Sequence, residues 1–256
     1  MNDSISLCTD EPLKKMKFIF FIALISLSLS TLISCSGSSN DAKPAQKKMD
    51  KIVADTINAA FLRDSSLFLT VEIGSQIWMK NDLQLTEFLN GDPISEARSN
   101  EEWVQFAKMK KPCFRKSGKS ILYNGYVLMD ERGLIPEDFR IPTSLDWDIL
   151  INELGGIIPM SKSISSYNWS EKTQVQSMNY EGNNSSGFSA IPTGYIYTSG
   201  NIAKGTCSFW WVNSSPQSLV PTKLSIFNIG FCDSEISRGM QLDPAFGACL
   251  RCLKKK

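Results

Sequence analysis

The chain has 256 residues, of which 42% are hydrophobic and 21% are charged, and its net charge is +1. This composition is typical of one globular domain beside an export segment, and the charge gives no indication of a nucleic-acid partner. Histidine is absent, which excludes Ser-His and Cys-His nucleophile pairs and every metal site that contains histidine. Catalysis by carboxylates, Tyr, Lys or Cys is still compatible with this composition.

Residues 1–35 are predicted to be a lipoprotein signal peptide. A lysine-rich segment precedes an apolar run over residues 18–33, in the order that secretory signals show. The run contains serines and is short for a permanent membrane span, which needs about 20 mostly apolar residues. It ends in Leu32-Ile-Ser-Cys35, which resembles a bacterial lipobox. The resemblance implies cleavage before Cys35 and lipidation of its thiol. The alternative is an ordinary signal peptide or an N-terminal anchor with an incidental cysteine.

The start of the chain is unusual for such a signal. Met16 would place a normal start ahead of the apolar run, so we predict that Met16 is the true initiator. Residues 36–66 are expected to form a flexible tether, because the stretch after the lipobox is small, polar and without periodicity. Within the tether, residues 50–63 carry apolar side chains at rough helical spacing, which indicates a short amphipathic helix.

The remaining residues, 67–256, are predicted to form one domain that begins with a β-hairpin. Two β-rich runs, 67–73 and 76–79, flank a Gly-Ser turn. A capping-box pattern follows at Ser99 and Glu102, and it predicts a helix that places Trp103 in the core.

The best-specified segment is residues 139–156. Thr143 is the expected N-cap of a helix, and Asp146 stands three residues later, where its carboxylate can reach back to the cap. Gly155-Gly156 supplies a left-handed stop. The apolar residues between them recur at i, i+3, i+4 and i+7 and predict one buried face: Trp147, Leu150, Ile151 and Leu154.

The second half of the domain is predicted to contain short strands and one long polar loop. The loop covers residues 161–186, and loops of this length in a compact domain often carry binding. Two helices among many short strands indicate an α+β fold. Strands or β-rich segments are expected over 121–127, 187–195, 206–212, 224–229 and 248–253.

Six blocks follow one another in order across this domain: Val71–Leu83, Leu122–Asn124, Phe139–Gly156, Ser186–Pro192, Gly205–Ser215 and Gly247–Lys254. Together they resemble the Fibrobacter succinogenes major paralogous domain, which is found in many Bacteroidetes and Fibrobacter surface proteins. The family is similar in outline to C-type-lectin-like domains and to the formylglycine-generating-enzyme group. The resemblance implies a compact C-type-lectin-like domain with two helices, short antiparallel strands and a long-loop region, but it transfers no activity.

The chain departs from the family pattern at several positions. Gly125 and Phe139 stand where the family has tryptophan, Ile196 replaces a frequent arginine, and Ile135 replaces a cysteine. The family pattern implies that this missing cysteine is the partner of Cys252. Cys252 is therefore expected to be buried and free, or else paired with Cys113.

Five of the seven cysteines follow the lipobox, so at least one of them lacks a partner within the chain. Exported chains meet an oxidising compartment, and we predict a disulfide between Cys207 and Cys232. Cys249 and Cys252 are three residues apart on a predicted strand. Odd separations point to opposite faces, so these two are not expected to pair or to form a redox or metal site.

No catalytic residue and no metal are predicted. Asp146 is explained as a cap and Asp148 as a residue of the polar helix face, and the acidic pair Glu137-Asp138 lies in a turn. The Glu-Pro-Asn, Gln-Pro-Asp and Trp-Asn-Asp triplets of calcium-dependent lectins are absent from the sequence.

Aromatic residues in and beside the long polar region form the candidate ligand site. An aromatic face with amide and hydroxyl groups nearby suits a carbohydrate or peptide surface. Trp210 and Tyr195 are expected in the core, whereas Trp169 and Trp211 are expected to be more exposed. The candidate ligand-binding residues are Trp169, Trp211, Tyr167, Tyr197 and Asn213.

The sequence therefore favours a lipoprotein of the bacterial outer membrane, on its periplasmic or extracellular face. Its domain is expected to bind a carbohydrate polymer or an envelope protein, without a cofactor and without nucleic acid. One alternative is an enzyme that acts on a surface polymer or on thiols. The other is a structural subunit of an envelope assembly.

Overall fold

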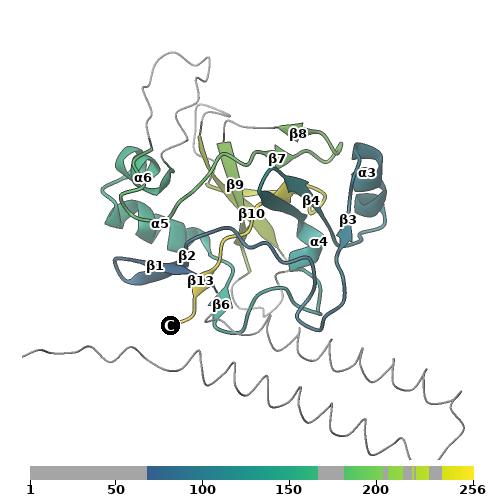
Figure 1. Ribbon diagram of the computed structural model, residues 1–256, viewed down its shortest axis with the longest axis horizontal. Helices are drawn as coiled ribbons and strands as arrows, with labels where there is room; N and C mark the ends of the chain where they lie inside the picture. The colour runs from purple at the N-terminus through teal and green to yellow at the C-terminus, as the bar shows by residue number, and fades with distance from the viewer. Residues whose placement is uncertain (1–67, 167–181, 204–206, 216–220, 222, 231–237) are drawn as a thin grey trace, which may run out of the picture. The chain divides into compact units, whose positions relative to one another are not determined.

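The computed structural model describes residues 68–166, 182–203, 207–215, 221, 223–230 and 238–256 (Figure 1). This part of the chain contains four helices and three mostly antiparallel sheets, so the predicted α+β class is confirmed. No helix within these residues is long and apolar enough to cross a membrane.

The first sheet has the strand order β1-β2-β13-β6 and contains the predicted hairpin. β1 (Thr70–Ile73) and β2 (Gln76–Met79) pair antiparallel around Gly74, whose φ of +56° is the left-handed conformation that glycine adopts at little cost. β13 (Leu253–Lys254) lies between β2 and β6 (Phe139–Arg140). The C-terminal end of the domain is thus tied to its first hairpin.

The second sheet has six short strands in the order β3-β4-β5-β12-β7-β8. Only β3 and β4 pair in parallel. The strands are β3 (Ser95–Glu96), β4 (Cys113–Ser117), β5 (Ser120–Asn124), β12 (Gly247–Ala248), β7 (Tyr195–Ile196) and β8 (Ile202–Ala203).

The third sheet has the order β11-β10-β9. The strands are β9 (Cys207–Asn213), β10 (Leu224–Gly230) and β11 (Arg238–Gln241). Two isolated parallel bridges join β9 to neighbouring segments, one between Gly194 and Ser208 and one between Trp210 and Cys249. β9 consequently runs through the middle of the domain.

Both predicted helices are confirmed together with their caps. In α3 (Asn100–Lys108), the Ser99 side chain accepts a hydrogen bond from the Glu102 N–H. In α5 (Ser144–Glu153), Thr143 and Asp146 form the predicted capping box. In Figure 1, α5 and α6 lie on the left of the domain and α3 lies on the right.

Two further helices correct the prediction of two. α4 (Gly125–Leu128) begins where β5 ends, because the Asn124 side chain accepts a hydrogen bond from the Val127 N–H and starts a helical turn. α6 (Ile157–Ile164) follows Gly156 directly and buries Met160 and Ile164. The predicted long loop therefore begins later than residue 161, and its residues 167–181 lie outside the described part of the chain.

Two predicted strands are also wrong. Residues 187–194 contain only two isolated bridges, from Ala190 to Ser165 and from Gly194 to Ser208, because Gly187, Ser189 and Gly194 have positive φ angles that a strand does not allow. The stretch predicted as one strand over 248–253 is divided into β12 and β13.

The core is built around tryptophans. Trp147 stacks on Phe227 with ring centroids 4.0 Å apart, and it also contacts Trp78 and Trp210. All three tryptophans are at most 1% exposed. Trp103 on the inner face of α3 and Trp211 on β9 are fully buried as well.

Candidate functional site

Trp211 is buried, so the expectation that it is exposed is wrong. Its side chain is 0% exposed, and its indole N–H donates to the Tyr123 carbonyl at 2.9 Å. Alternation along β9 sends Trp210 and Trp211 to opposite faces, but both faces of this strand are packed. The predicted burial of Trp210 is confirmed.

Tyr197 is the predicted site residue that the structure places at the surface. Its side chain is 47% exposed, and its ring centroid lies 4.8 Å from that of Tyr195 at an interplanar angle of 69°. The two hydroxyl groups are 2.6 Å apart and hydrogen-bonded. Tyr195 is half-buried, because it stacks on Phe246 and contacts Phe209. We call Tyr195 and Tyr197 the tyrosine platform.

Asn213 is not brought to the tyrosine platform. It ends β9, five residues beyond Ser208 and about 17 Å along the strand from the Gly194–Ser208 bridge that leads into β7. Its side-chain oxygen accepts from the Ser215 N–H at 2.8 Å and from the Ser215 hydroxyl. Asn213 therefore closes a local turn. Tyr167 and Trp169, the other candidates, lie outside the described residues.

A surface hollow of 380 Å³ lies between α3 and the turn after β7, and it was missed from the sequence. One wall is the outer face of α3, and the other is Ser199 in the turn between β7 and β8. The turn is closed by the Gly200 N–H, which donates to the Tyr197 carbonyl at 2.8 Å. The Ser199-Gly200-Asn201 run is a turn signal that could have indicated this element. The lining residues are Asn100, Glu101, Val104, Gln105, Lys108 and Ser199.

The rim of the hollow is fixed by contacts between three elements. An Arg115 Nη1 group from β4 donates to the Asn100 side-chain oxygen at 2.8 Å and to the Gly200 carbonyl at 3.0 Å. The Asn100 amide donates to the Asn201 side-chain oxygen at 2.8 Å. Gly200 has a φ of +82°, and a Cβ there would lie 2.5 Å from the Asn100 carbonyl oxygen. The turn can approach α3 this closely only because residue 200 is glycine.

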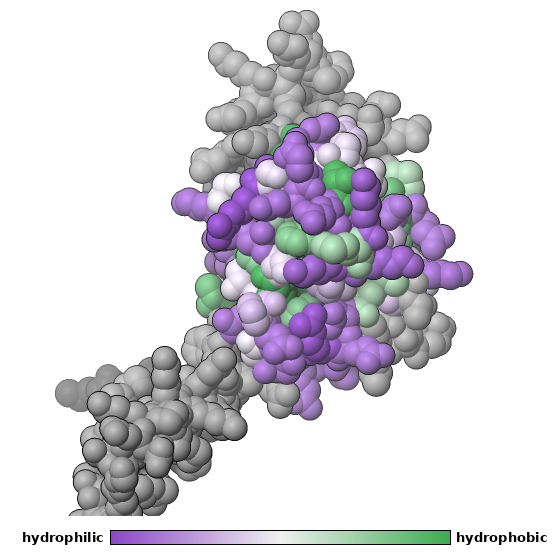
Figure 2. Space-filling model, turned by 90° about the vertical axis from the view of Figure 1, so that its right-hand side faces the viewer, coloured by the Kyte–Doolittle hydropathy of each residue, from purple (hydrophilic) through white to green (hydrophobic). Residues whose placement is uncertain are grey.

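The lining of the hollow contains one acidic side chain, Glu101, and one basic side chain, Lys108, and Arg115 in the rim adds a second positive charge. Hydrogen bonds from its own backbone N–H and from Ser99 lower the pKa of the Glu101 carboxyl, and the nearby Arg115 lowers it further. Lys108 stands seven residues later on α3, about 10 Å along the helix axis. Figure 2 shows the side of the molecule that lies on the right in Figure 1, where α3 is. Hydrophilic residues cover most of this face, and apolar residues form small groups between them.

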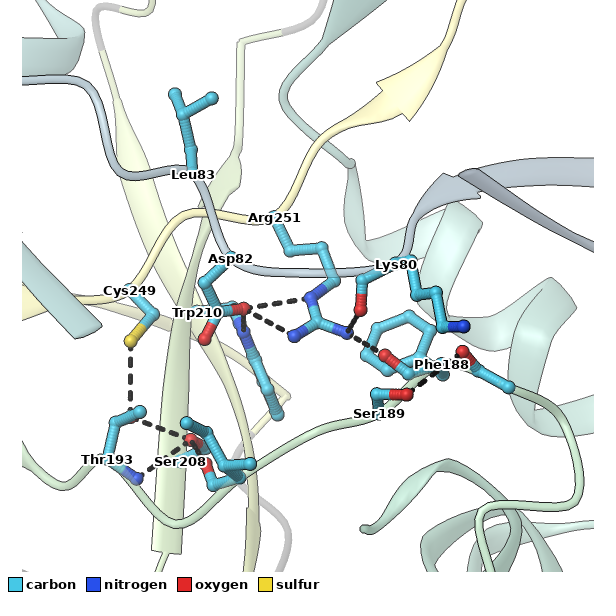
Figure 3. Close-up of polar contacts among 12 residues, drawn as sticks. Lys80, Asp82, Leu83, Phe188, Ser189, Thr193, Ser208, Trp210, Cys249 and Arg251 are labelled. Atoms are coloured by element: carbon cyan, nitrogen blue, oxygen red, sulfur yellow. Dashed lines mark hydrogen bonds and ion pairs between the residues drawn. The ribbon is translucent and has the colours of Figure 1, made fainter. Parts of the chain in front are cut away.

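A buried ion pair supports the segment that leads to β7 (Figure 3). One carboxylate oxygen of Asp82 accepts from Arg251 Nε and from the Trp210 indole N–H, each at 2.8 Å. Arg251 is 1% exposed, donates to the carbonyl groups of Lys80 and Phe188, and lies over the Phe188 ring at 4.2 Å. The guanidinium group thereby fixes the backbone at residue 188.

A chain of hydroxyl groups continues this support (Figure 3). The Cys249 thiol donates to the Thr193 hydroxyl at 3.1 Å, and that hydroxyl is hydrogen-bonded to Ser208 Oγ at 2.8 Å. Ser208 in turn donates to the Ile191 carbonyl at 2.6 Å. Residues 191–193 are consequently held against β9, two residues before β7 begins at Tyr195.

The cysteines within the described residues are structural. Burial, followed by the negative charge of Asp82, raises the pKa of both Cys249 and Cys252, and burial raises the pKa of Cys113 to about 12. All three are free and buried, so the expectation that Cys249 and Cys252 do not pair with each other is confirmed, and Cys252 is not bonded to Cys113. Cys207 is disulfide-bonded. Its predicted partner, Cys232, lies outside the described residues, so that pairing stays a prediction.

The carboxylate of Asp146 acts in the helix cap. Burial acts to raise its pKa, but hydrogen bonds from the Arg140 guanidinium at 2.6 and 2.7 Å, and from Thr143, outweigh burial and lower it. The part of the chain that the structure describes contains no group of three or more Cys, Asp or Glu residues that could hold a metal ion.

Comparison with known proteins gives a family. No curated protein and no solved structure matches the chain. The model of the Fibrobacter succinogenes major domain matches residues 71–254, which include every strand and helix described above except Thr70, the first residue of β1. The chain therefore belongs to the Fibrobacter succinogenes major domain family.

Proposed function

We propose that this domain binds an extracellular polymer, either a carbohydrate or a partner protein, and catalyses no reaction. The observation that carries the proposal is the tyrosine platform, in which Tyr197 is 47% exposed on a support of packed aromatic rings. An exposed tyrosine offers an apolar face and a polar hydroxyl, and little conformational entropy is lost when a supported ring binds.

The chemistry of the surrounding groups supports binding over catalysis. The hollow between α3 and the turn after β7 is lined by one carboxylate, that of Glu101, whereas acid–base catalysis by carboxylates commonly uses a pair. The thiols of Cys113, Cys249 and Cys252 are buried, and their raised pKa values keep them protonated and unreactive.

We also propose that the chain is a lipoprotein of the outer membrane, attached through Cys35. The support is the lipobox resemblance at Leu32–Cys35 and the polar tether after it. Growth with a labelled fatty acid tests this proposal: the wild-type protein is expected to carry label in the membrane fraction, and Cys35→Ser is expected to carry none. Label on the Cys35→Ser protein would overturn it.

The C-type-lectin-like arrangement is likewise proposed. It is supported by the mixture of helices with short, mostly antiparallel strands, and by the long segment between α6 and β7. An experimental structure that superposes on lectin-like domains with this strand order would bear it out, and a different order would refute it.

The binding proposal is tested with a glycan array and with pull-downs from envelope extracts. Tyr197→Ala is expected to weaken capture about tenfold, because the exposed ring is the main contact. Leu145→Ala is the matched control, since Leu145 is an exposed apolar residue, 67% exposed, on a different helix. Equal capture by wild type and Tyr197→Ala would count against the platform. Turnover of a substrate without stable capture would overturn the function.

A further inference from the structure

We propose that the tyrosine platform is a site of oxidative modification, at which the rings of Tyr195 and Tyr197 are joined to form a dityrosine. The reaction uses a peroxide together with a one-electron oxidant such as a haem peroxidase. This inference concerns the chemical reactivity of the platform, and it does not depend on whether the platform binds a polymer.

The two phenol groups already lie close to the arrangement of the coupled product. Dityrosine is formed between ring carbons next to the hydroxyl groups, so the product holds its two hydroxyl groups beside each other. In the platform the hydroxyl oxygens are 2.6 Å apart and hydrogen-bonded. The ring centroids are 4.8 Å apart, near the close end of the range of about 4.5 to 7 Å for aromatic pairs. Little movement of the side chains is therefore needed before the new bond can form.

The backbone places both rings on one face of the sheet. Tyr195 begins β7 and Tyr197 follows its last residue, and residues at i and i+2 of an extended chain project to the same side. Ile196 projects to the other side, because a Cβ added at Gly247 would lie 2.8 Å both from the Ile196 Cβ and from the Trp103 ring. The two tyrosines consequently face away from α3 and toward each other.

One ring is fixed by packing and the other is open to an oxidant. Tyr195 stacks on Phe246 with ring centroids 5.3 Å apart, and its centroid lies 4.4 Å from that of Phe209. Tyr197 is 47% exposed, and its backbone N–H donates to the Asn201 carbonyl at 2.9 Å. A radical that forms on the exposed ring therefore has a held ring as its neighbour.

The coupling is a two-electron oxidation. Each phenol gives up its O–H hydrogen, as one proton and one electron, and becomes a phenoxyl radical. The radicals combine through one ring carbon of each residue, next to the oxygen. The hydrogen on each of these carbons then leaves as a proton, and each phenolate oxygen takes up a proton, which restores both hydroxyl groups. The net loss of two hydrogen atoms reduces one hydrogen peroxide to two water molecules.

The test is oxidation of the purified full-length protein, at low concentration, with a haem peroxidase and a limiting amount of hydrogen peroxide. The wild-type monomer is expected to gain dityrosine fluorescence and to lose the mass of two hydrogen atoms. Tandem mass spectrometry of the digested protein is expected to place the link between Tyr195 and Tyr197.

Three variants separate this pair from the other tyrosines. Tyr195→Phe and Tyr197→Phe are each expected to lower the yield of dityrosine in the monomer at least about fivefold, because the neighbouring ring then lacks the hydroxyl needed to form a radical. Tyr126→Phe is the matched control, since Tyr126 is a half-buried tyrosine on α4, and it is expected to keep the wild-type yield. Thermal unfolding of the three variants checks that the fold is intact.

Two results would overturn the inference. One is dityrosine that appears only in covalent dimers, which would mean that coupling takes place between molecules. The other is a link between different residues, or a wild-type yield from Tyr197→Phe. Neither result bears on the proposed binding function, because capture by the glycan array and the pull-downs uses protein that has not been oxidised.

Discussion

α3 and α5 begin in the same way and serve different purposes. Each has a hydroxyl N-cap, an acidic residue three positions later and a buried tryptophan directly after that acid, namely Trp103 in α3 and Trp147 in α5. The outer face of α3 is polar and lines the hollow, whereas the outer face of α5 carries Leu145 and Ile149. A cap and a tryptophan therefore determine where a helix starts and how it attaches, while the outer face determines what it can bind.

Replacement of either tryptophan by alanine is the largest expected effect. Trp147→Ala and Trp103→Ala are each expected to lower the free energy of unfolding by about 3 to 5 kcal/mol, because each leaves a cavity among packed rings. Urea denaturation measures both. A loss below about 1 kcal/mol at either position would show that the tryptophan does not attach its helix to the core.

The acidic residues at the two caps are expected to differ. Asp146 accepts from Thr143 and from both ends of the Arg140 guanidinium, whereas Glu102 accepts from the Arg98 N–H at the surface. Asp146→Asn is therefore expected to cost about 1.5 to 3 kcal/mol, and Glu102→Gln less. Equal losses in urea denaturation would contradict the assignment of a deeper role to Asp146.

The same carboxylate predicts a pH dependence. The pKa of Asp146 is lower in the folded state than its ordinary value, so the unfolded state binds a proton first as the pH falls. Its contribution to stability is complete above the unfolded pKa of about 3.9 and is lost as the pH falls through the folded pKa. Between neutral and acid pH, the unfolding free energy of Asp146→Asn is expected to fall less than that of the wild type. Parallel curves would contradict this.

The indole groups predict a smaller difference. The Trp103 N–H donates to the Ala245 carbonyl at 2.8 Å, whereas the Trp147 N–H makes no hydrogen bond within the described part of the chain. Trp103→Phe is therefore expected to cost about 1 kcal/mol more than Trp147→Phe. Thermal unfolding of the two variants measures the difference, and a larger loss for Trp147→Phe would reverse the interpretation.

The outer faces give the smallest expected effect on stability. Gln105→Ala on α3 and Ile149→Gln on α5 are each expected to change the unfolding free energy by no more than about 0.5 kcal/mol, because neither side chain lies in the core. A larger loss for Gln105→Ala would show that the wall of the hollow also has a structural role.

Elements that depend on neighbours in the chain could be predicted from the sequence. The capping boxes at Ser99 and Thr143, the hairpin around Gly74 and the glycine stop after α5 each use hydrogen bonds or dihedral angles within a few residues. The order of the family blocks also indicated the family, and the match of the family model to residues 71–254 confirms it. Such patterns can be predicted because the interacting groups are close together in the sequence.

The exposure of side chains and the shape of the surface were decided by tertiary structure. Trp211 and Tyr197 both lie in aromatic strand segments, and only the packing on both faces of β9 buries the first while the end of β7 exposes the second. The Asp82–Arg251 pair joins residues 169 apart in sequence, and the hollow needs α3, β4 and the β7–β8 turn together. No local pattern encodes such contacts, because the burial of each group depends on segments that meet only in the folded chain.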